Sequence, residues 1–275
     1  MIVFPNCKIN LGLRILRKRE DGFHDIETIF YPVPVHDALE ILPIQKDKDS
    51  SLQFEQTGLS IKGATQQNLC VKAYRLLQEI KPDLPPAYIH LHKNIPMGAG
   101  LGGGSADGVF TLLALQSLFE FSLSKQENEK IALELGSDCP FFLLQQAAWG
   151  LGRGEKLTPL PLSLSGYQIL LIHPGISIAT AEAFRGVSPR IEGEPLTNSI
   201  LRPIEEWKTV VQNQFEETIF IKYPELKKIK STLYKAGALY ASMSGSGSTI
   251  FGIFPPDASR PTLEPYPWIQ WKKIP

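Results

Sequence analysis

The 275-residue sequence predicts a mixed fold of strands and helices in two lobes, and three observations support this prediction. Segments in which apolar and polar residues alternate, as in strands, are interleaved with segments in which apolar residues recur at helical spacing. Glycine-rich turns separate several of these segments. A stretch rich in proline and serine, residues 159–166, indicates a boundary between two lobes, so we expect domains at 1–158 and 159–275.

The composition argues against several classes of protein. Lysine plus arginine equals aspartate plus glutamate, 28 each, so a surface for nucleic acid is not expected. Cys7, Cys70 and Cys139 lack metal-ligand spacing and fit a reducing compartment. No apolar run approaches the length of a membrane span, and polar residues near the N-terminus make a poor signal peptide. We therefore expect a cytoplasmic protein without nucleic-acid or membrane partners.

The first lobe opens with an alternating strand. Over residues 7–15, leucine and isoleucine side chains share one face, whereas Lys8, Asn10 and Gly12 share the other. In isolation, a lysine and an asparagine two residues apart can simply be solvated, and that alternative stays open. Further strands are predicted at 23–30, 38–43, 51–55 and 87–93, with a turn around 46–50 and a helix at 68–80.

Two helices and a cap are predicted in the remainder of the first lobe. Apolar residues recur at helical spacing from 106 to 118, so a helix should open at Ser105. Ser124 and Glu127 form a capping box ahead of a helix over 128–135, which Gly136 ends. Asp138 stands just before a proline and could be an ordinary N-cap. A second glycine-rich turn follows at 150–154.

The second lobe begins with a strongly apolar strand at 167–174. Helices are predicted at 180–185, 204–220 and 224–236, the last ended by Gly237. The Ser-Gly-Ser-Gly-Ser stretch at 244–248 precedes an apolar strand, so it is either a hairpin loop or a second nest of N–H groups beside phosphates. Residues 255–275 show no clear pattern.

The most informative stretch is the glycine run at residues 96–107, which has glycine at positions 98, 100, 102, 103 and 104. Such a run costs backbone entropy on folding, so either positive φ angles or a close approach to its N–H groups must justify it. A strand precedes the run and a helix follows it. Backbone N–H groups gathered at a helix N-terminus are suited to phosphate.

The glycine run can be compared with three known sequence patterns of phosphate-binding loops, and it matches them to different degrees. The P-loop pattern fails because Gly104 occupies the lysine position, and the protein-kinase pattern fails because neither His-Arg-Asp nor Asp-Phe-Gly follows. The dinucleotide fingerprint matches formally at Gly98, Gly100 and Gly103, with Glu120 at a tolerable distance for a ribose. A dinucleotide-dependent dehydrogenase and a glycine-rich turn without a ligand therefore remain alternatives.

The complete string Pro-x-x-x-Gly-Leu-Gly-Gly-Gly-Ser-Ala resembles the ATP loop of the GHMP kinases, named for galactokinase and the homoserine, mevalonate and phosphomevalonate kinases. Further motifs in order along the chain are similar to one family within that superfamily. This family phosphorylates the 2-hydroxyl of 4-diphosphocytidyl-2-C-methyl-D-erythritol with ATP, in the non-mevalonate isoprenoid precursor pathway. The matching motifs are residues 8–11 (Lys-Ile-Asn-Leu), 21–24 (Asp-Gly-Phe-His), 93–106, 136–142, 152–158, 173–177, 213–216 (Asn-Gln-Phe-Glu) and 243–249.

The resemblance implies a two-lobed α+β GHMP kinase fold, with the glycine-rich ATP loop in the N-terminal lobe and an α/β-sandwich as the C-terminal lobe. It implies ATP and Mg²⁺ as cofactors and a small-molecule partner, the cytidine diphosphate ester of methylerythritol. The implied ATP-binding residues are Asn68, Lys93, Pro96, Met97, Gly98, Ala99, Gly100, Leu101, Gly102, Gly103, Gly104, Ser105 and Ala106.

The resemblance also assigns catalytic roles. Lys8 and Asp138 match the family's catalytic pair, with Asp138 as the base toward the attacking hydroxyl and Lys8 stabilising the charges that develop. Asn10 would hydrogen-bond the substrate, and Ser105 can reach a phosphate oxygen or Mg²⁺. No paired carboxylates stand at metal-cage spacing, so no metal ligand is assigned with certainty and Mg²⁺ is expected to arrive with ATP.

Recognition of the cytosine base is assigned to three further residues. Phe23 and Phe184 match the positions at which the family stacks aromatic rings on the base, and His24 is the expected reader of the base edge. Phe23 replaces the family's usual tyrosine, and a Gly-Ser-Gly replaces the usual Gly-Thr-Gly of the last loop. A homoserine- or mevalonate-type GHMP kinase and a GHMP fold without turnover remain alternatives, and no oligomeric state is predicted.

Overall fold

The computed structural model describes residues 1–45, 51–61, 63–190 and 193–275, which form two compact units. Unit 1 comprises residues 1–7, 36–97 and 102–145, and unit 2 comprises residues 8–35, 98–101 and 146–275. The units are interleaved along the chain, with the glycine run contributing to both. The turn predicted around 46–50 lies outside the described residues. The predicted domain boundary between residues 158 and 159 stays a prediction.

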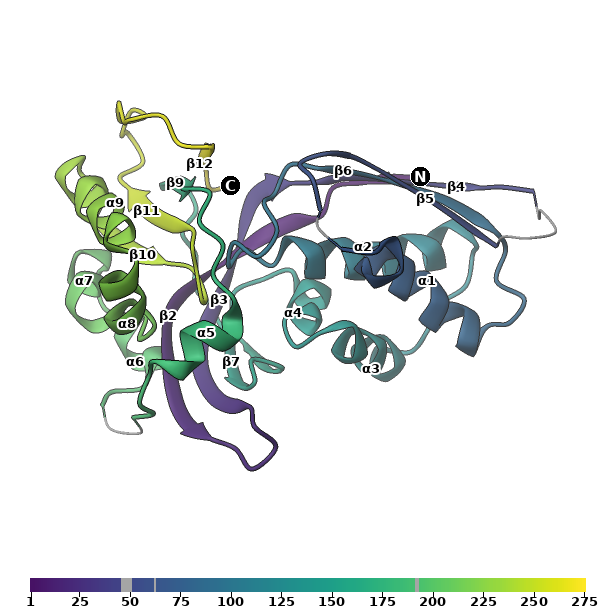
Figure 1. The fold of residues 1–275 in the computed structure, drawn as a ribbon, viewed down its shortest axis with the longest axis horizontal. Coiled ribbons are helices and arrows are strands. Elements are labelled where there is room, and N and C mark those ends of the chain that lie inside the picture. The colour runs from purple at the N-terminus through teal and green to yellow at the C-terminus, as the bar shows by residue number, and fades with distance from the viewer. Residues whose placement is uncertain (46–50, 62, 191–192) are drawn as a thin grey trace. The chain divides into compact units, whose positions relative to one another are not determined.

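Unit 1 contains a four-stranded sheet in the order β1-β4-β6-β5. Strand β6 pairs antiparallel with β4 and parallel with β5. Figure 1 shows α1 and α2 lying along one face of this sheet. The strands are β1 (Ile2–Val3), β4 (Ala38–Pro43), β5 (Leu52–Gly58) and β6 (Ala87–Lys93), and the helices are η1 (Thr65–Gln67), α1 (Leu69–Ile80), α2 (Gly103–Leu118), α3 (Lys125–Leu135) and α4 (Cys139–Leu144).

Most predicted elements of unit 1 are confirmed, because local signals determine them. Asn68 is the N-cap of α1, and its side chain accepts a hydrogen bond from the Cys70 N–H at 2.9 Å. The capping box of Ser124 and Glu127 begins α3 as predicted. Helix α2 begins two residues earlier than predicted, because Gly102, with φ of 68°, is its N-cap. The first turn of α2 is therefore made by the end of the glycine run.

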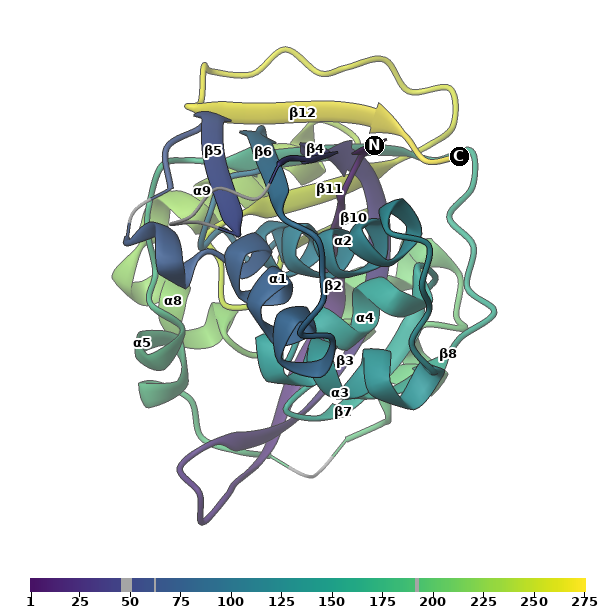
Figure 2. The same cartoon turned by 90° about the vertical axis from the view of Figure 1, so that its right-hand side faces the viewer.

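Unit 2 contains two four-stranded sheets, in the orders β2-β3-β7-β8 and β10-β11-β9-β12. In the second sheet β9 pairs antiparallel with β11 on one side and with β12 on the other, so residues 255–275 supply an edge strand that no sequence pattern predicted (Figure 2). The strands are β2 (Asn6–Lys18, its first two residues in unit 1), β3 (His24–His36), β7 (Ala148–Gly152), β8 (Lys156–Pro159), β9 (Gln168–His173), β10 (Tyr240–Met243), β11 (Ile250–Phe254) and β12 (Trp268–Lys273).

The continuous helix predicted at 204–220 is wrong, because the chain breaks at residues 211–215 to pair with β2. The Leu13 N–H donates to the Gln212 carbonyl at 2.9 Å, and the Gln214 N–H donates to the Leu13 carbonyl at 2.8 Å. These long-range bonds replace helical ones. The helices of unit 2 are α5 (Thr180–Arg185), α6 (Leu196–Ser199), η2 (Ile204–Glu206), α7 (Trp207–Val210), α8 (Glu216–Lys222) and α9 (Pro224–Lys235).

Asn213, in the middle of that break, secures the loop between β10 and β11. Its buried amide nitrogen donates to the carbonyls of Met243 at 2.7 Å and Gly245 at 2.8 Å, and its oxygen accepts from the Phe215 N–H at 3.0 Å. The core beneath this loop packs α9 against β10 and β11 (Figure 1). It includes Leu170, Ile172, Phe215, Leu226, Ile229, Leu233, Ile250 and Phe254.

Candidate active site

The N-terminus of α2 presents backbone N–H groups that the described part of the chain does not cap. Gly102 provides no side chain for capping, and the first turn contains no acidic residue. Gly98, Gly100 and Gly102 all have positive φ, which turns successive N–H groups through the run. Orphan N–H groups at the positive end of a 16-residue helix form a site for an anion such as phosphate.

Gly103, the first residue of α2, packs too closely against the preceding strand to carry a side chain. A Cβ at this position would lie 2.8 Å from Cγ2 of Ile95 and 3.0 Å from Nζ of Lys93. Real Cβ atoms almost never approach other atoms within 3.0 Å. The glycine is therefore required by packing within unit 1, in addition to any approach of a phosphate.

Lys93 is enclosed by carboxylates. Its Nζ donates to Oδ2 of Asp107 at 2.6 Å and to Oδ2 of Asp37, and the lysine side chain is 0% exposed. Burial alone would lower the pKa of Lys93, but the two carboxylates outweigh it and raise that pKa above its ordinary value. The predicted contact between Lys93 and the nucleotide stays a prediction.

Asp138 occupies the N-cap position of α4, but its side chain does not cap this helix within the described residues. The alternative that Asp138 is an ordinary N-cap is therefore wrong. Its neighbours are informative, because burial raises the pKa of the Cys139 thiol to about 12, an effect opposed by a hydrogen bond with Ser105 and increased by the charge of Asp138. Unit 1 thus gathers Ser105, Cys139 and Asp138 where α2 packs on α4.

Lys8 and Asn10 lie on β2 in unit 2, and both are buried, so the solvated alternative is wrong. The Lys8 ammonium donates to Oδ1 of Asn10 at 2.7 Å and lies 5.1 Å from the centroid of the Phe30 ring. The Asn10 amide in turn donates to Oγ1 of Thr28 at 3.0 Å. These interactions hold both side chains on the strand face that the alternation predicted.

Two loops pack together beside these residues in unit 2. The Lys8 N–H donates to the Leu101 carbonyl at 2.9 Å, and the Asn10 N–H donates to Oγ of Ser244 at 3.2 Å. The Ser244 hydroxyl donates to the Gly100 carbonyl at 2.8 Å, and a Cβ on Gly100 would lie 2.0 Å from the Ser244 carbonyl oxygen. The stretch at 244–248 is thus a hairpin loop, one of its two predicted forms, and it lies against the glycine run.

The three residues predicted to bind the base also lie in unit 2. The rings of His24 and Phe184 stack on each other, with centroids 4.6 Å apart and planes 16° apart. Phe23 is 52% exposed, and the guanidinium of Arg153 lies 5.0 Å from its ring centroid. The Phe184 ring therefore contacts an imidazole ring and the Phe23 ring contacts a guanidinium, and a base held between the two phenylalanines stays a prediction.

The sequence assigned no individual role to Asp37, Asp107 or Ser244. Asp37 lies between two predicted strands, Asp107 ends the glycine run, and Ser244 begins the Ser-Gly-Ser-Gly-Ser stretch. Their partners are distant in sequence, so no local periodicity reveals them. The pairing of Lys8 with Asp138, which belong to different units, also stays a prediction.

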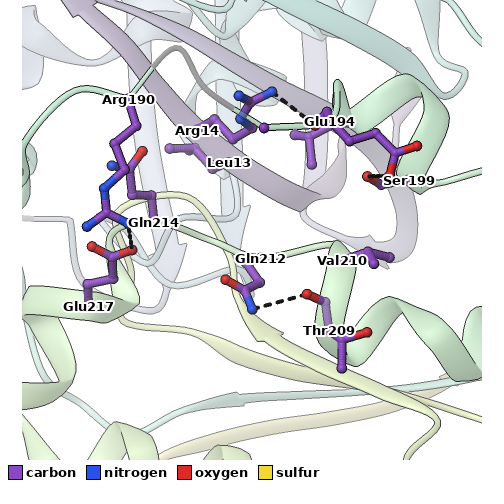
Figure 3. Close-up of a pocket in the computed structure, with 12 residues that line it drawn as sticks. Leu13, Arg14, Arg190, Glu194, Ser199, Thr209, Val210, Gln212, Gln214 and Glu217 are labelled. Atoms are coloured by element: carbon purple, nitrogen blue, oxygen red, sulfur yellow. Dashed lines mark hydrogen bonds and ion pairs between the residues drawn. The ribbon is translucent and has the colours of Figure 1, made fainter.

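A pocket of about 300 Å³ in unit 2 is lined by residues that do not include the predicted site residues (Figure 3). Its arginines are already engaged, Arg190 with Glu217 at 2.9 Å and Arg14 with the Glu194 carbonyl at 3.1 Å. Across the described ranges, no cluster of three or more His, Cys, Asp or Glu is placed to hold a metal ion. No helix there has the length and hydropathy needed to cross a bilayer.

Comparison with known proteins agrees with the predicted family. Residues 68–146 match the GHMP kinases N terminal domain, and residues 201–264 match the GHMP kinases C terminal domain. The chain is 47% identical over 257 residues to the 4-diphosphocytidyl-2-C-methyl-D-erythritol kinase of Bacteroides fragilis, covering 94% of this chain and 93% of the relative. It is 49% identical over 255 residues to the kinase of the same name from Cytophaga hutchinsonii, covering 92% of each.

Solved structures agree with this relationship. A crystal structure of 4-(cytidine 5'-diphospho)-2C-methyl-D-erythritol kinase has a TM-score of 0.79 and 33% identity, over 92% of this chain and 90% of that one. The mevalonate kinase of Methanococcus jannaschii has a TM-score of 0.64 at 15% identity, covering 92% and 90%, and shows the fold alone. The predicted GHMP kinase fold is confirmed. The chain belongs to the GHMP kinases and, within them, to the family of the 4-diphosphocytidyl-2-C-methyl-D-erythritol kinases, which are small-molecule kinases.

Proposed function

We propose that this chain transfers the γ-phosphoryl group of ATP to the 2-hydroxyl of 4-diphosphocytidyl-2-C-methyl-D-erythritol, a step of the non-mevalonate isoprenoid precursor pathway. The observation that carries the proposal is 45–49% identity, over more than nine-tenths of the chain, to relatives that bear the name of this kinase. A location in the cytoplasm is part of the proposal, and the three cysteines are buried thiols, which fits a reducing compartment.

The residues at the start of α2 fit the phosphates of ATP. Uncapped N–H groups, the positive end of a helix and a Cβ-free backbone would together supply donors without a steric obstacle. The proposed ATP site therefore comprises the run from Pro96 to Ala106, with Asn68 and Lys93 as more distant members. Mg²⁺ bound with ATP would neutralise phosphate charge, and the Ser105 hydroxyl, in the first turn of α2, is its candidate protein contact.

The proposed chemistry places Asp138 as the base and Lys8 as its cationic partner. As the substrate's 2-hydroxyl oxygen bonds to the γ-phosphorus, its proton passes to the Asp138 carboxylate, and ADP leaves as the bridging bond to the β-phosphate breaks. Lys8 would stabilise the developing alkoxide, and Asn10, which already orients the Lys8 ammonium at 2.7 Å, would hydrogen-bond the substrate. A weak base suffices because phosphoryl transfer has a loose transition state.

The proposed base site uses Phe184 and Phe23 as stacking surfaces and His24 as the reader of the cytosine edge. In the structure, the His24 ring covers one face of Phe184. A base that stacks on that face must therefore displace the imidazole, and the proposed role requires the displaced ring to contact the base edge. Stacking tolerates any base, so selectivity must come from the polar contact.

The acceptor is tested by measuring ADP formation with 4-diphosphocytidyl-2-C-methyl-D-erythritol, homoserine and mevalonate at equal concentrations. We expect kcat/KM for the cytidine substrate to exceed that for homoserine or mevalonate by at least about 1,000-fold. Neither of these two acceptors carries the diphosphocytidyl group, which would supply much of the binding energy. A preference for homoserine or mevalonate would contradict the proposal. NADH fluorescence that rises on mixing would favour the dehydrogenase alternative.

The base is tested by Asp138→Asn, which preserves shape but removes the proton acceptor. We expect kcat to fall about 100-fold or more while ATP affinity changes less than about twofold, because general-base catalysis contributes on this scale. Asp83→Asn, at an aspartate whose side chain is 78% exposed, serves as the matched control and should leave kcat unchanged. Near-normal turnover of Asp138→Asn with saturating substrates would remove Asp138 from the chemistry.

Base recognition is tested with two variants and two nucleotides. Phe184→Ala should raise KM for the cytidine substrate about 5- to 150-fold and leave KM for ATP unchanged, because one stacked ring contributes about 1–3 kcal/mol. His24→Ala should instead narrow the preference for the cytidine substrate over its uridine analogue, because it removes an edge contact. An unaltered cytidine-to-uridine ratio in the His24 variant would show that another group reads the base.

A further inference from the structure

We propose that a buried charge cluster, formed by Asp37, Lys93 and Asp107, is the positioning device of the ATP loop. In this proposal, which rests on the proposed function, Lys93 promotes nucleotide binding by holding the loop backbone and does not contact the nucleotide itself. All three residues belong to unit 1, as do both ends of the glycine run, residues 96–97 and 102–107, and the two residues that precede it. The cluster thus lies within one compact unit.

The cluster connects the strand that enters the glycine run to the helix that leaves it. Lys93 is the last residue of β6, and Asp107 lies in the second turn of α2. The Lys93 ammonium donates to both aspartates, and the three side chains are 0–2% exposed. An ion pair in so dry an environment is strong and rigid, so the distance between strand end and helix start is fixed.

Asp37 extends this connection to the loop backbone. While its Oδ2 accepts from Lys93, its Oδ1 accepts from the N–H groups of Asn94 at 2.6 Å and Ile95 at 2.8 Å. These are the first two residues after β6, so one carboxylate sets the direction in which the chain enters the run. Gly103, at the other end, rests on Ile95 and Lys93, where a Cβ would lie 2.8 Å and 3.0 Å away.

The two aspartates are unequal, and the difference provides a test. Oδ1 of Asp107 has no hydrogen-bond partner in the described part of the chain. Burial and, to a lesser extent, the charge of Asp37 raise the pKa of Asp107, and the charge of Lys93 opposes them. Asp107 therefore contributes one acceptor oxygen, whereas both oxygens of Asp37 accept from donors.

An amide can replace Asp107 but cannot replace Asp37. In Asp107→Asn, the carbonyl oxygen can face Lys93 while the NH₂ group takes the place of an oxygen that opposes no donor. In Asp37→Asn, either orientation directs the NH₂ group at donors, toward the ammonium of Lys93 or toward the N–H groups of Asn94 and Ile95. The same chemical change should therefore displace the loop at one position only.

The experiment compares Asp37→Asn with Asp107→Asn in the full chain. We expect Asp37→Asn to raise the Kd for ATP, measured by calorimetry without acceptor, at least tenfold and to raise KM for ATP more than it lowers kcat, because the loop binds phosphates in ground and transition states alike. Asp107→Asn should raise the Kd less than threefold, and the exposed Asp83→Asn should leave it unchanged. Equal effects of the two cluster variants, or an unaltered Kd in a folded Asp37→Asn, would overturn the proposal.

Hydrogen exchange in the wild-type chain decides the matter if Asp37→Asn does not fold, and it requires neither ATP nor the acceptor. The amides of Asn94 and Ile95 should be protected to the level of the amides within β6, although they lie outside that strand. Exchange at the rate of an exposed loop would overturn the proposal. Because this readout is independent of catalysis, a failed acceptor assay would refute the proposed function without refuting the positioning cluster.

Discussion

The geometry of the candidate ATP loop depends on the ion pairs that the buried Lys93 ammonium forms with the carboxylates of Asp37 and Asp107. Burying three ionisable groups is expensive, and removing Lys93 or Asp37 would leave buried polar groups without their partners. The arrangement depends most on these two residues, because both oxygens of Asp37 accept hydrogen bonds, whereas Oδ1 of Asp107 has no partner among the described residues. A strand end, two loop amides and the start of α2 are therefore held together by a single cluster of charges.

Unit 2 carries the predicted residues Lys8 and Asn10, and its own loops are ordered by other interactions. Residues 98–101, the part of the glycine run that belongs to unit 2, lie against β2 and the loop after β10. There the Ser244 hydroxyl donates to the Gly100 carbonyl and accepts from the Asn10 N–H. The Asn213 amide holds that loop in place by donating hydrogen bonds to two of its carbonyl groups. Hydrogen bonds and close backbone packing therefore help to order the strand face that carries Lys8 and Asn10.

The fold was predictable wherever local chemistry determines it. Alternation located β4 and β6 to the residue, and the Ser124 capping box located the start of α3. Prediction failed where long-range bonds decide, as at residues 211–215, where pairing with Leu13 interrupts a helical pattern. The same limit applies to the candidate site. The spacing of Lys8 and Asn10 predicts that they share one strand face, but only the structure shows that both are buried. Asp37 was missed because its partners are distant in sequence.

Binding of the ATP phosphates at the N-terminus of α2 can be measured by amide NMR of the isotopically labelled full chain. Titration with ATP and Mg²⁺ should produce the largest shifts at the N–H groups of Gly102, Gly103, Gly104 and Ser105, with one saturation curve for all four. Adenosine, which lacks phosphates, should leave these four signals in place. Shifts of equal size with adenosine, or ATP binding that leaves residues 102–105 unshifted, would contradict the account.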